Sequence, residues 1–272
     1  MTSLPTPTIS VIIPTQRRPA RLWRALASVA AQSYPAVEVV VVNDGGVPVE
    51  QIVARYRQEC GRPIIYIALP EQRGVGGARN AGIAVASGTL LALLDDDDRY
   101  LPGHLARLAK SLADHPDASA AYDEALIQVE AGSAEEAEPR VVATCRFGLA
   151  YDEQRFRHDD YIVPGTLLLR REAFERAGRF DETLPALEDW DLLLRLRAFG
   201  GFHFTAGIGL EYSQRVQAGD NASSVFDDRR RATLDTLSAR YGLPHLEPKT
   251  FLDVARELGF ALRPTEAQPP RT

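Results

Sequence analysis

The feature that most constrains this chain is an apolar run followed directly by four consecutive aspartates. Leu90 to Leu94 begins soon after Gly88 and predicts a buried strand, and Asp95 to Asp98 follow it. In open α/β sheets ligands bind at the carboxyl ends of the strands, so we expect the acids at a binding edge. Adjacent carboxylates repel one another by about 1 kcal/mol per pair at 4 Å in water. A divalent cation would relieve this repulsion, and a solvated acidic loop is the alternative.

Strands and helices alternate through the first part of the chain. Residues 37–42 are nearly all valine, the pattern of a parallel strand that is buried on both faces. The alternating order predicts a parallel, doubly wound sheet with helices on both faces. The expected strands are 9–13, 37–42, 64–68 and 90–94. One helix is expected to begin at Pro19, and two more are expected at 49–60 and 75–86.

The alternation weakens after the aspartates. The acidic segment 132–138 is expected to be an exposed hairpin loop, and the proline-rich tail from Arg263 is expected to fray. The sequence contains neither an internal repeat nor an interdomain linker, so a single domain spanning 1–272 is predicted. The expected helices are 101–113, 172–177, one from Leu187 and 227–241, and the expected strands are 120–129, 166–170 and 202–205.

The composition excludes several classes of protein. A net charge of −6 over 272 residues argues against general nucleic-acid binding, which favours basic patches. Cys60 and Cys145 lie far apart without metal-ligand spacing, as in proteins of a reducing compartment. The N-terminus lacks the features of a signal peptide, and no apolar run approaches the roughly 20 residues of a membrane span. We expect a cytoplasmic protein, for which peripheral contact with the inner face of a membrane stays open.

Polar groups follow three of the predicted strands, and a glycine-rich turn at 73–82 leads into a helix that carries arginines. Such a turn brings backbone N–H groups and guanidinium groups close to an anion. Four segments in this order resemble the motifs of the family 2 glycosyltransferases of the GT-A fold, over about 9–223. The segments are 10–15 (SVIIPT), 39–45 (VVVVNDG), 77–82 (GARNAG) and 93–98 (LLDDDD).

The resemblance implies a GT-A-like α/β fold, with a Rossmann-like, mostly parallel sheet and helices on both faces. A nucleotide-sugar-binding half would cover about 9–100, a mixed acceptor-side and catalytic half 101–225, and C-terminal helices and tail 226–272. Asp44 would accept hydrogen bonds from the base or ribose of a nucleotide-sugar, although aspartate is also common in turns. The residues implied in nucleotide-sugar binding are Pro14, Thr15, Arg18, Asp44, Arg73, Arg79, Asp95 and Asp96.

The resemblance also implies a divalent metal, Mn²⁺ or Mg²⁺, that stabilises negative charge on the leaving diphosphate. Asp97 would bind this metal, and Asp95 would approach the metal or the ribose. If the segment is extended, Asp96 and Asp98 alternate to the other side, so at least one of them is expected to be structural or solvated.

The chain departs from the family in a late segment, 212–223, where many members carry a metal-binding histidine. Gln217 occupies that position here, and an amide is a weaker ligand than imidazole but suits a hard cation. Arg215 could instead offset the charge of the diphosphate. The histidines show no metal-ligand spacing, and only His158, beside Asp159-Asp160-Tyr161, is a candidate for binding the acceptor.

A second group of acids, Glu188-Asp189-Trp190-Asp191, resembles the acidic pair that the family carries at the start of a helix. Sugar transfer with inversion requires one carboxylate to take the proton of the attacking hydroxyl. Successive helical residues point about 100° apart, so Glu188 and Asp189 cannot both face one carbon. Asp189 is predicted to be the general base and Glu188 to bind hydroxyl groups. Acids also favour helix N-termini for electrostatic reasons alone.

The predicted function is an inverting, metal-dependent glycosyltransferase that moves a sugar from a nucleotide-diphosphate sugar to an acceptor hydroxyl. A glycan or lipid-linked saccharide is the expected acceptor, in polysaccharide or glycoconjugate synthesis. The sequence does not distinguish UDP, dTDP and GDP, and it specifies neither the linkage nor the oligomeric state.

Two other classes of enzyme fit the sequence less well. A dehydrogenase would need its glycine fingerprint directly after the first strand, and a haloacid-dehalogenase-like phosphatase would need its nucleophile strand near the start of the chain. A nucleotide-sugar-binding module without transferase activity is the alternative.

Overall fold

The structure is a computed structural model, and it describes residues 6–133, 136–215 and 228–265. Its N-terminal half alternates strands and helices as the sequence predicts. In chain order the elements are β1 (Ile9–Thr15), α1 (Pro19–Ala30), β2 (Val37–Asn43), α2 (Glu50–Cys60), β3 (Ile64–Ala68), α3 (Gly74–Val85) and β4 (Leu90–Leu93). The strands lie in the order β3-β2-β1-β4 and pair in parallel, which confirms the predicted parallel sheet.

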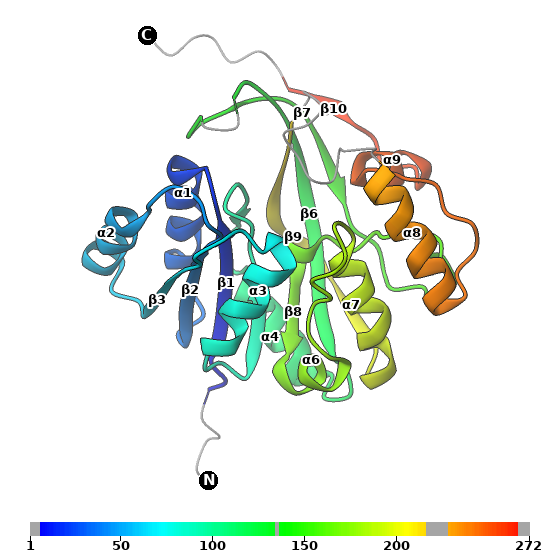
Figure 1. The fold of residues 1–272 in the computed structure, drawn as a ribbon, viewed down its shortest axis with the longest axis horizontal. Coiled ribbons are helices and arrows are strands. Elements are labelled where there is room, and N and C mark those ends of the chain that lie inside the picture. The colour runs from blue at the N-terminus through cyan, green and yellow to red at the C-terminus, as the bar shows by residue number, and fades with distance from the viewer. Residues whose placement is uncertain (1–5, 134–135, 216–227, 266–272) are drawn as a thin grey trace.

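Helix α3 packs closely on this parallel sheet, in front of β1 in Figure 1. Every residue of β1 and β2 is buried, as the continuous valine and isoleucine runs require. A Cβ atom at Gly82 of α3 would lie 2.7 Å from Cγ2 of Ile12 and 3.0 Å from Cγ2 of Val42. The helix can approach the strands this closely only because Gly82 has no side chain.

The second half of the chain adds a mixed sheet and the remaining helices. Strand β8 runs antiparallel to β4 and β6, and β6 pairs with β7 antiparallel and with β9 in parallel. None of the described helices is long and apolar enough to cross a bilayer. The elements are β5 (Arg99–Tyr100), α4 (His104–Asp114), β6 (Ala120–Ala131), β7 (Arg140–Phe147), α5 (Glu153–Phe156), η1 (Pro164–Thr166), β8 (Leu167–Arg170), α6 (Arg171–Ala177), α7 (Glu188–Leu196), η2 (Arg197–Phe199), β9 (Phe202–Arg215), α8 (Asp228–Tyr241), α9 (Phe251–Glu257) and β10 (Arg263–Pro264).

Several strands differ from the sequence-based expectation: the short β5 and β10 were not predicted, and β10 pairs with β7 where the chain was expected to begin to fray. The strand predicted at 202–205 is too short, because β9 continues to Arg215 beside β6. Its last part contains Ser213 and Gln214, polar residues that are buried by this pairing and that give no strand signal in the sequence. Strand β7, which follows the predicted hairpin loop, was not among the expected strands.

The ends of several elements meet at one edge of the sheet. Strand β1 ends at Thr15 opposite Asn43, the last residue of β2, and β4 ends beside them. The start of α7 reaches the same edge, because Arg79 of α3 contacts Glu188. The end of β9 arrives there too, where Ser213 contacts the aspartate run. The fold therefore gathers the chemically interesting segments of both halves in one place.

Replacing Gly82 with valine is expected to lower the free energy of unfolding by about 2 kcal/mol, because the added methyl groups would push α3 away from β1. Gly201→Val is the matched control, since a Cβ atom there meets nothing within 4 Å. The control should stay within about 0.5 kcal/mol of the wild type. Urea denaturation measures both, and an equal loss in the two variants would contradict the close approach of α3.

Candidate active site

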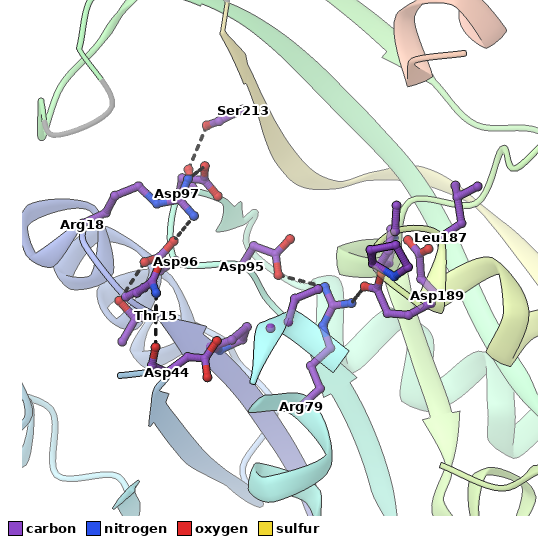
Figure 2. Close-up of a pocket in the computed structure, with 18 of the residues that line it drawn as sticks. Thr15, Arg18, Asp44, Arg79, Asp95, Asp96, Asp97, Leu187, Asp189 and Ser213 are labelled. Carbon is purple, nitrogen blue, oxygen red and sulfur yellow. Dashed lines mark hydrogen bonds and ion pairs between the residues drawn. The ribbon is translucent and has the colours of Figure 1, made fainter. Parts of the chain in front are cut away.

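The gathered strand ends and the start of α7 enclose a cavity of about 550 Å³. This volume is typical of small-molecule sites. Figure 2 shows Thr15 and Asp44 toward one end and Asp189 toward the other, with Asp95 and Arg79 between them. The sequence-predicted residues that line the cavity are Pro14, Thr15, Arg18, Asp44, Arg79, Asp95, Asp96, Asp97, Glu188 and Asp189.

Asp44 is held in place by backbone groups at the end of β2. Its own N–H donates a hydrogen bond to the carbonyl of Thr15 (2.8 Å), and its Oδ1 accepts one from the N–H of Arg73 (2.7 Å). Thr15 donates its hydroxyl to Oδ2 of Asp96 (2.7 Å). These bonds fix the ends of β1 and β2 and the glycine-rich turn around one wall of the cavity.

The aspartates after β4 form a turn rather than an extended segment, so the expected simple alternation of their side chains is wrong. The N–H of Asp98 donates to the carbonyl of Asp95 (3.1 Å), which closes the turn. Asp95, Asp96 and Asp97 therefore all line the cavity. Asp98 is buried instead and accepts a hydrogen bond from the N–H of Ser213 (2.9 Å), which makes it the structural member of the run.

Guanidinium groups neutralise the acidic run. Arg18 forms ion pairs with Asp96 (2.6 Å) and with Asp97, and Arg215 reaches Asp97 from the end of β9 (2.6 Å). Both arginines contact the same oxygen, Oδ2, of Asp97. Burial raises the pKa of Asp96 to about 6, and the charge of Arg18 opposes that rise. From the sequence we inferred a cation because the aspartates repel one another. In the structure, arginines relieve this repulsion.

Arg79 connects the acidic run with the start of α7. Its side chain is buried in α3; Nη2 contacts Oδ1 of Asp95 (2.9 Å) and Nη1 contacts Oε1 of Glu188 (3.0 Å). The guanidinium carbon also lies 5.6 Å from the ring centroid of Phe180. A buried charge is tolerated only when it is paired and hydrogen-bonded. Arg79 therefore fixes Asp95 and Glu188 relative to one another.

The acidic pair begins α7, and its two members have different surroundings. Glu188 is buried against Arg79, whereas Asp189 is half-buried in the cavity wall. Leu187, just before them, has a φ of 57°, and no other non-glycine residue in the described ranges has a positive φ. This conformation costs an L-residue roughly 1–2 kcal/mol, and such strain clusters at functional sites. Trp190, next along the helix, is buried in the core.

Among the residues that the structure describes, one predicted site residue, Arg73, does not line the cavity. The side chain of Arg73 forms an ion pair with Glu182 (2.6 Å), and only its backbone N–H binds Asp44. The structure therefore does not bring the Arg73 guanidinium to the predicted nucleotide site, because Glu182 holds it elsewhere. Gln217 lies outside the described residues.

Other residues line the cavity without having been predicted to do so. Some of them come from the loop before η1, from β9 and from the C-terminal helices, where packing rather than a local motif brings them to the cavity. The sequence pointed to His158, which does not line this cavity but lies in the wall of a smaller one beside α7; its side chain is exposed and contacts the carbonyl of Gln154 (2.8 Å). The additional cavity residues with polar or aromatic side chains include Asp160, Tyr212, Arg230 and Phe251.

The side chains suit a hard cation but do not form a complete metal site by themselves. Within 6–133, 136–215 and 228–265, no group of three His, Cys, Asp or Glu residues could hold a metal ion. Asp95 and Asp97 nevertheless present carboxylates on the same cavity wall. Mg²⁺ is commonly bound by one or two carboxylates together with substrate phosphates. The donor set therefore fits a cation whose coordination a diphosphate would complete.

Comparison with known sequences identifies the family. The model of "Glycosyl transferase family 2" matches residues 10–178, well over half of the chain. The chain belongs to glycosyl transferase family 2. This membership confirms the resemblance found in the four sequence segments, and it makes the protein a glycosyltransferase.

Relatives of this glycosyltransferase match it along most of its length. It is 32% identical over 255 residues to the uncharacterized glycosyltransferase YwdF of Bacillus subtilis (strain 168), covering 92% of this chain and 90% of YwdF. It is 27% identical over 296 residues to the succinoglycan biosynthesis protein ExoU of Rhizobium meliloti (strain 1021), covering 96% of this chain and 82% of ExoU.

Solved structures with the same fold include two ligand complexes. The mannosyltransferase PcManGT from Pyrobaculum calidifontis, in complex with GDP-Man and Mn²⁺, has a TM-score of 0.63 at 18% identity over 89% of this chain. S. aureus TarS 1-349, in complex with UDP-GlcNAc, has a TM-score of 0.58 at 18% identity over 85% of this chain. This glycosyltransferase spans 66% of the length of each solved chain. At such identity the likeness establishes the GT-A fold.

The buried Glu188 is expected to make stability depend on pH. Burial, with a further contribution from the charge of Asp189, raises the pKa of Glu188 from 4.5 to about 7. Between these values the folded protein binds more protons than the unfolded chain, so the free energy of unfolding falls as pH rises. The fall attributable to Glu188 should be on the order of 3 kcal/mol. Urea denaturation across this range should show a flatter profile for Glu188→Gln; an unchanged slope would contradict the assignment.

Proposed function

We propose that this glycosyltransferase moves a sugar, with inversion of the anomeric centre, from a nucleotide-diphosphate sugar to an acceptor hydroxyl. The observation that carries the proposal is the order of groups along one cavity, with Asp44 at one end, the acidic run next and Asp189 at the other end. The same order runs through the reactants, from nucleoside to diphosphate to sugar and acceptor.

The donor end offers contacts for a nucleoside and for phosphates. Asp44 would accept hydrogen bonds from the base or ribose, and Thr15 would line the same wall. The cavity wall includes Gly74 at the start of α3, where helical N–H groups favour an anion. Arg18, which lines the cavity and already binds carboxylates, presents a guanidinium group that also suits phosphate oxygens.

Asp189 is the proposed general base. It would take the proton of the acceptor hydroxyl while that oxygen forms a bond to C1 of the sugar. The bond between C1 and the diphosphate oxygen breaks, and the diphosphate leaves with the electron pair. Attack from the opposite face inverts the centre without a covalent intermediate. Glu188 is less suited because Arg79 binds its carboxylate, so we assign it to a sugar hydroxyl.

A divalent cation, Mn²⁺ or Mg²⁺, belongs to the proposal. Asp95 and Asp97 would hold it, and a role for Gln217 stays a prediction from the sequence. When bound, the cation would neutralise charge on the leaving diphosphate. The Mn²⁺ that accompanies GDP-Man in PcManGT supports this assignment. Arg18 and Arg215 would have to release Oδ2 of Asp97 or share that carboxylate with the cation.

The proposed acceptor is a glycan or lipid-linked saccharide, in polysaccharide or glycoconjugate synthesis. Support comes from ExoU, whose name assigns it to succinoglycan biosynthesis. The nucleotide is less constrained, because PcManGT was solved with GDP-Man and TarS with UDP-GlcNAc. The choice of nucleotide is therefore a matter for direct measurement.

One nucleoside diphosphate among UDP, dTDP and GDP should raise the melting temperature, and more strongly with Mn²⁺ than without it. At a ligand concentration of 100 Kd the stabilisation is about 2.7 kcal/mol, by mass action. A thermal-shift series with each nucleotide, with and without Mn²⁺, measures the effect. Asp44→Ala should reduce the shift, and no shift of the wild type with any nucleotide would contradict the donor site.

Asp189→Asn is expected to lower kcat by roughly 10²–10⁴-fold, because an amide cannot take the proton of the attacking hydroxyl. The nucleotide-induced shift in melting temperature should persist in this variant. Asp117→Asn, at an exposed position outside the cavity, is the matched control. Release of nucleoside diphosphate from the donor measures turnover, and full activity of Asp189→Asn would show that another group is the base.

A further inference from the structure

The cavity continues past Asp189 toward the C-terminal helices. Asp160, Leu187, Arg230 and Phe251 line both the main cavity and a smaller one beside α7. The wall on this side is built by the loop before η1 and by α8 and α9; α8 stands beside α7 in Figure 1, and α9 lies next to α8. None of these elements has a part in the proposed donor site, so this end is available to the second reactant.

Asp160 is a polar group whose hydrogen-bonding needs the described residues do not meet. Its Oδ1 is shielded from solvent, and no described residue donates a hydrogen bond to it. The neighbouring positions are fixed, because Asp159 binds Lys249 (2.8 Å) and the hydroxyl of Tyr161 accepts from the N–H of Asp152 (2.8 Å). A buried carboxyl oxygen without a hydrogen bond lowers the stability of the fold. Such an atom therefore needs an explanation, and one explanation is that a ligand supplies the missing partner.

Two aromatic side chains form an apolar wall of the cavity at this end. Tyr212 of β9 and Phe251 of α9 pack edge to face, with ring centroids 5.6 Å apart, and both line the cavity. Aromatic rings accept the apolar part of a ligand while a few convergent polar groups fix its orientation. A sugar ring combines these features, with C–H groups on its faces and hydroxyl groups at its edge.

We propose that Asp160, Tyr212 and Phe251 form a subsite for the acceptor, a neutral sugar ring with adjacent hydroxyl groups. One hydroxyl is presented to Asp189, and its neighbour binds the carboxyl group of Asp160, which lines the same cavity. A neutral ring fits because an anionic one would face the carboxylate of Asp189. The inference rests on the proposed function and assigns the chemical class of its acceptor.

The electrostatic surroundings of Asp160 agree with this geometry. Burial, followed by the charge of Asp189, raises the pKa of Asp160 well above its ordinary range, and Arg230 opposes the rise. A protonated carboxyl can both donate a hydrogen bond to a sugar hydroxyl and accept one from it.

The stability of Asp160→Ala distinguishes a binding role from a structural one. Removing an unpaired buried oxygen should leave the melting temperature unchanged or raise it, whereas removing a structural group would lower it. Asp117→Ala, at an exposed position, is the control. A clear fall in the melting temperature of Asp160→Ala alone would overturn the proposal.

Binding of the acceptor class is tested with the methyl glycosides of glucose, galactose and mannose, by saturation-transfer difference NMR. The wild type and Asp117→Ala should bind at least one probe, and Asp160→Ala should bind it about 10-fold more weakly. Asp160→Asn should fall between them, because an amide still bonds hydroxyl groups. Equal binding by Asp160→Ala and the wild type, or no probe bound by the wild type, would overturn the proposal.

The nucleotide-induced thermal shift, measured on the same proteins, reports the donor site separately. A shift with unaltered glycoside binding in Asp160→Ala would refute the acceptor subsite and leave the donor proposal standing. Glycoside binding that depends on Asp160, without a shift for any nucleotide, would refute the donor proposal instead.

Discussion

The buried guanidinium of Arg79 is the interaction on which the site depends. It binds Asp95 after β4 and Glu188 at the start of α7, and thereby joins the parallel half of the sheet to the second half of the chain. Without a cation between them, two acids brought together at a buried site would repel each other strongly. The acidic segments of the two halves can therefore converge on one cavity only because α3 supplies this charge.

The same principle applies to the rest of the acidic run. Arg18 and Arg215, which are far apart in the sequence, both neutralise Asp97. Ser213 connects the same region to a buried ion pair. The hydroxyl of Ser213 donates to Oε1 of Glu130 (2.9 Å), whose other oxygen pairs with Arg21 (2.8 Å). The end of β9 is thus tied to the metal-binding residues we propose. Binding of a cation and diphosphate would redistribute these contacts.

Much of the fold could be predicted because its signals are local. The valine run of β2 has no solvated face, so it had to be a central parallel strand, and the acids after β4 had to lie at the edge of the sheet. The end of β9 and the Asp160 subsite could not be predicted in this way. Ser213 and Gln214 are polar, and only pairing with β6 makes a buried strand of them. Asp160 reaches the cavity through the packing of its loop.

The sequence by itself determined the order of strands and helices in the N-terminal half, the position of the acidic run and the presence of an acidic pair at a helix start. These depend on periodicity and on neighbouring residues. Tertiary structure alone decided which charges compensate one another: Arg79 and Glu188 are 109 positions apart, and Asp97 and Arg215 are 118 apart. The physical reason is that the energy of a charge depends on its burial and on its partners in space, and neither is encoded by neighbours along the chain.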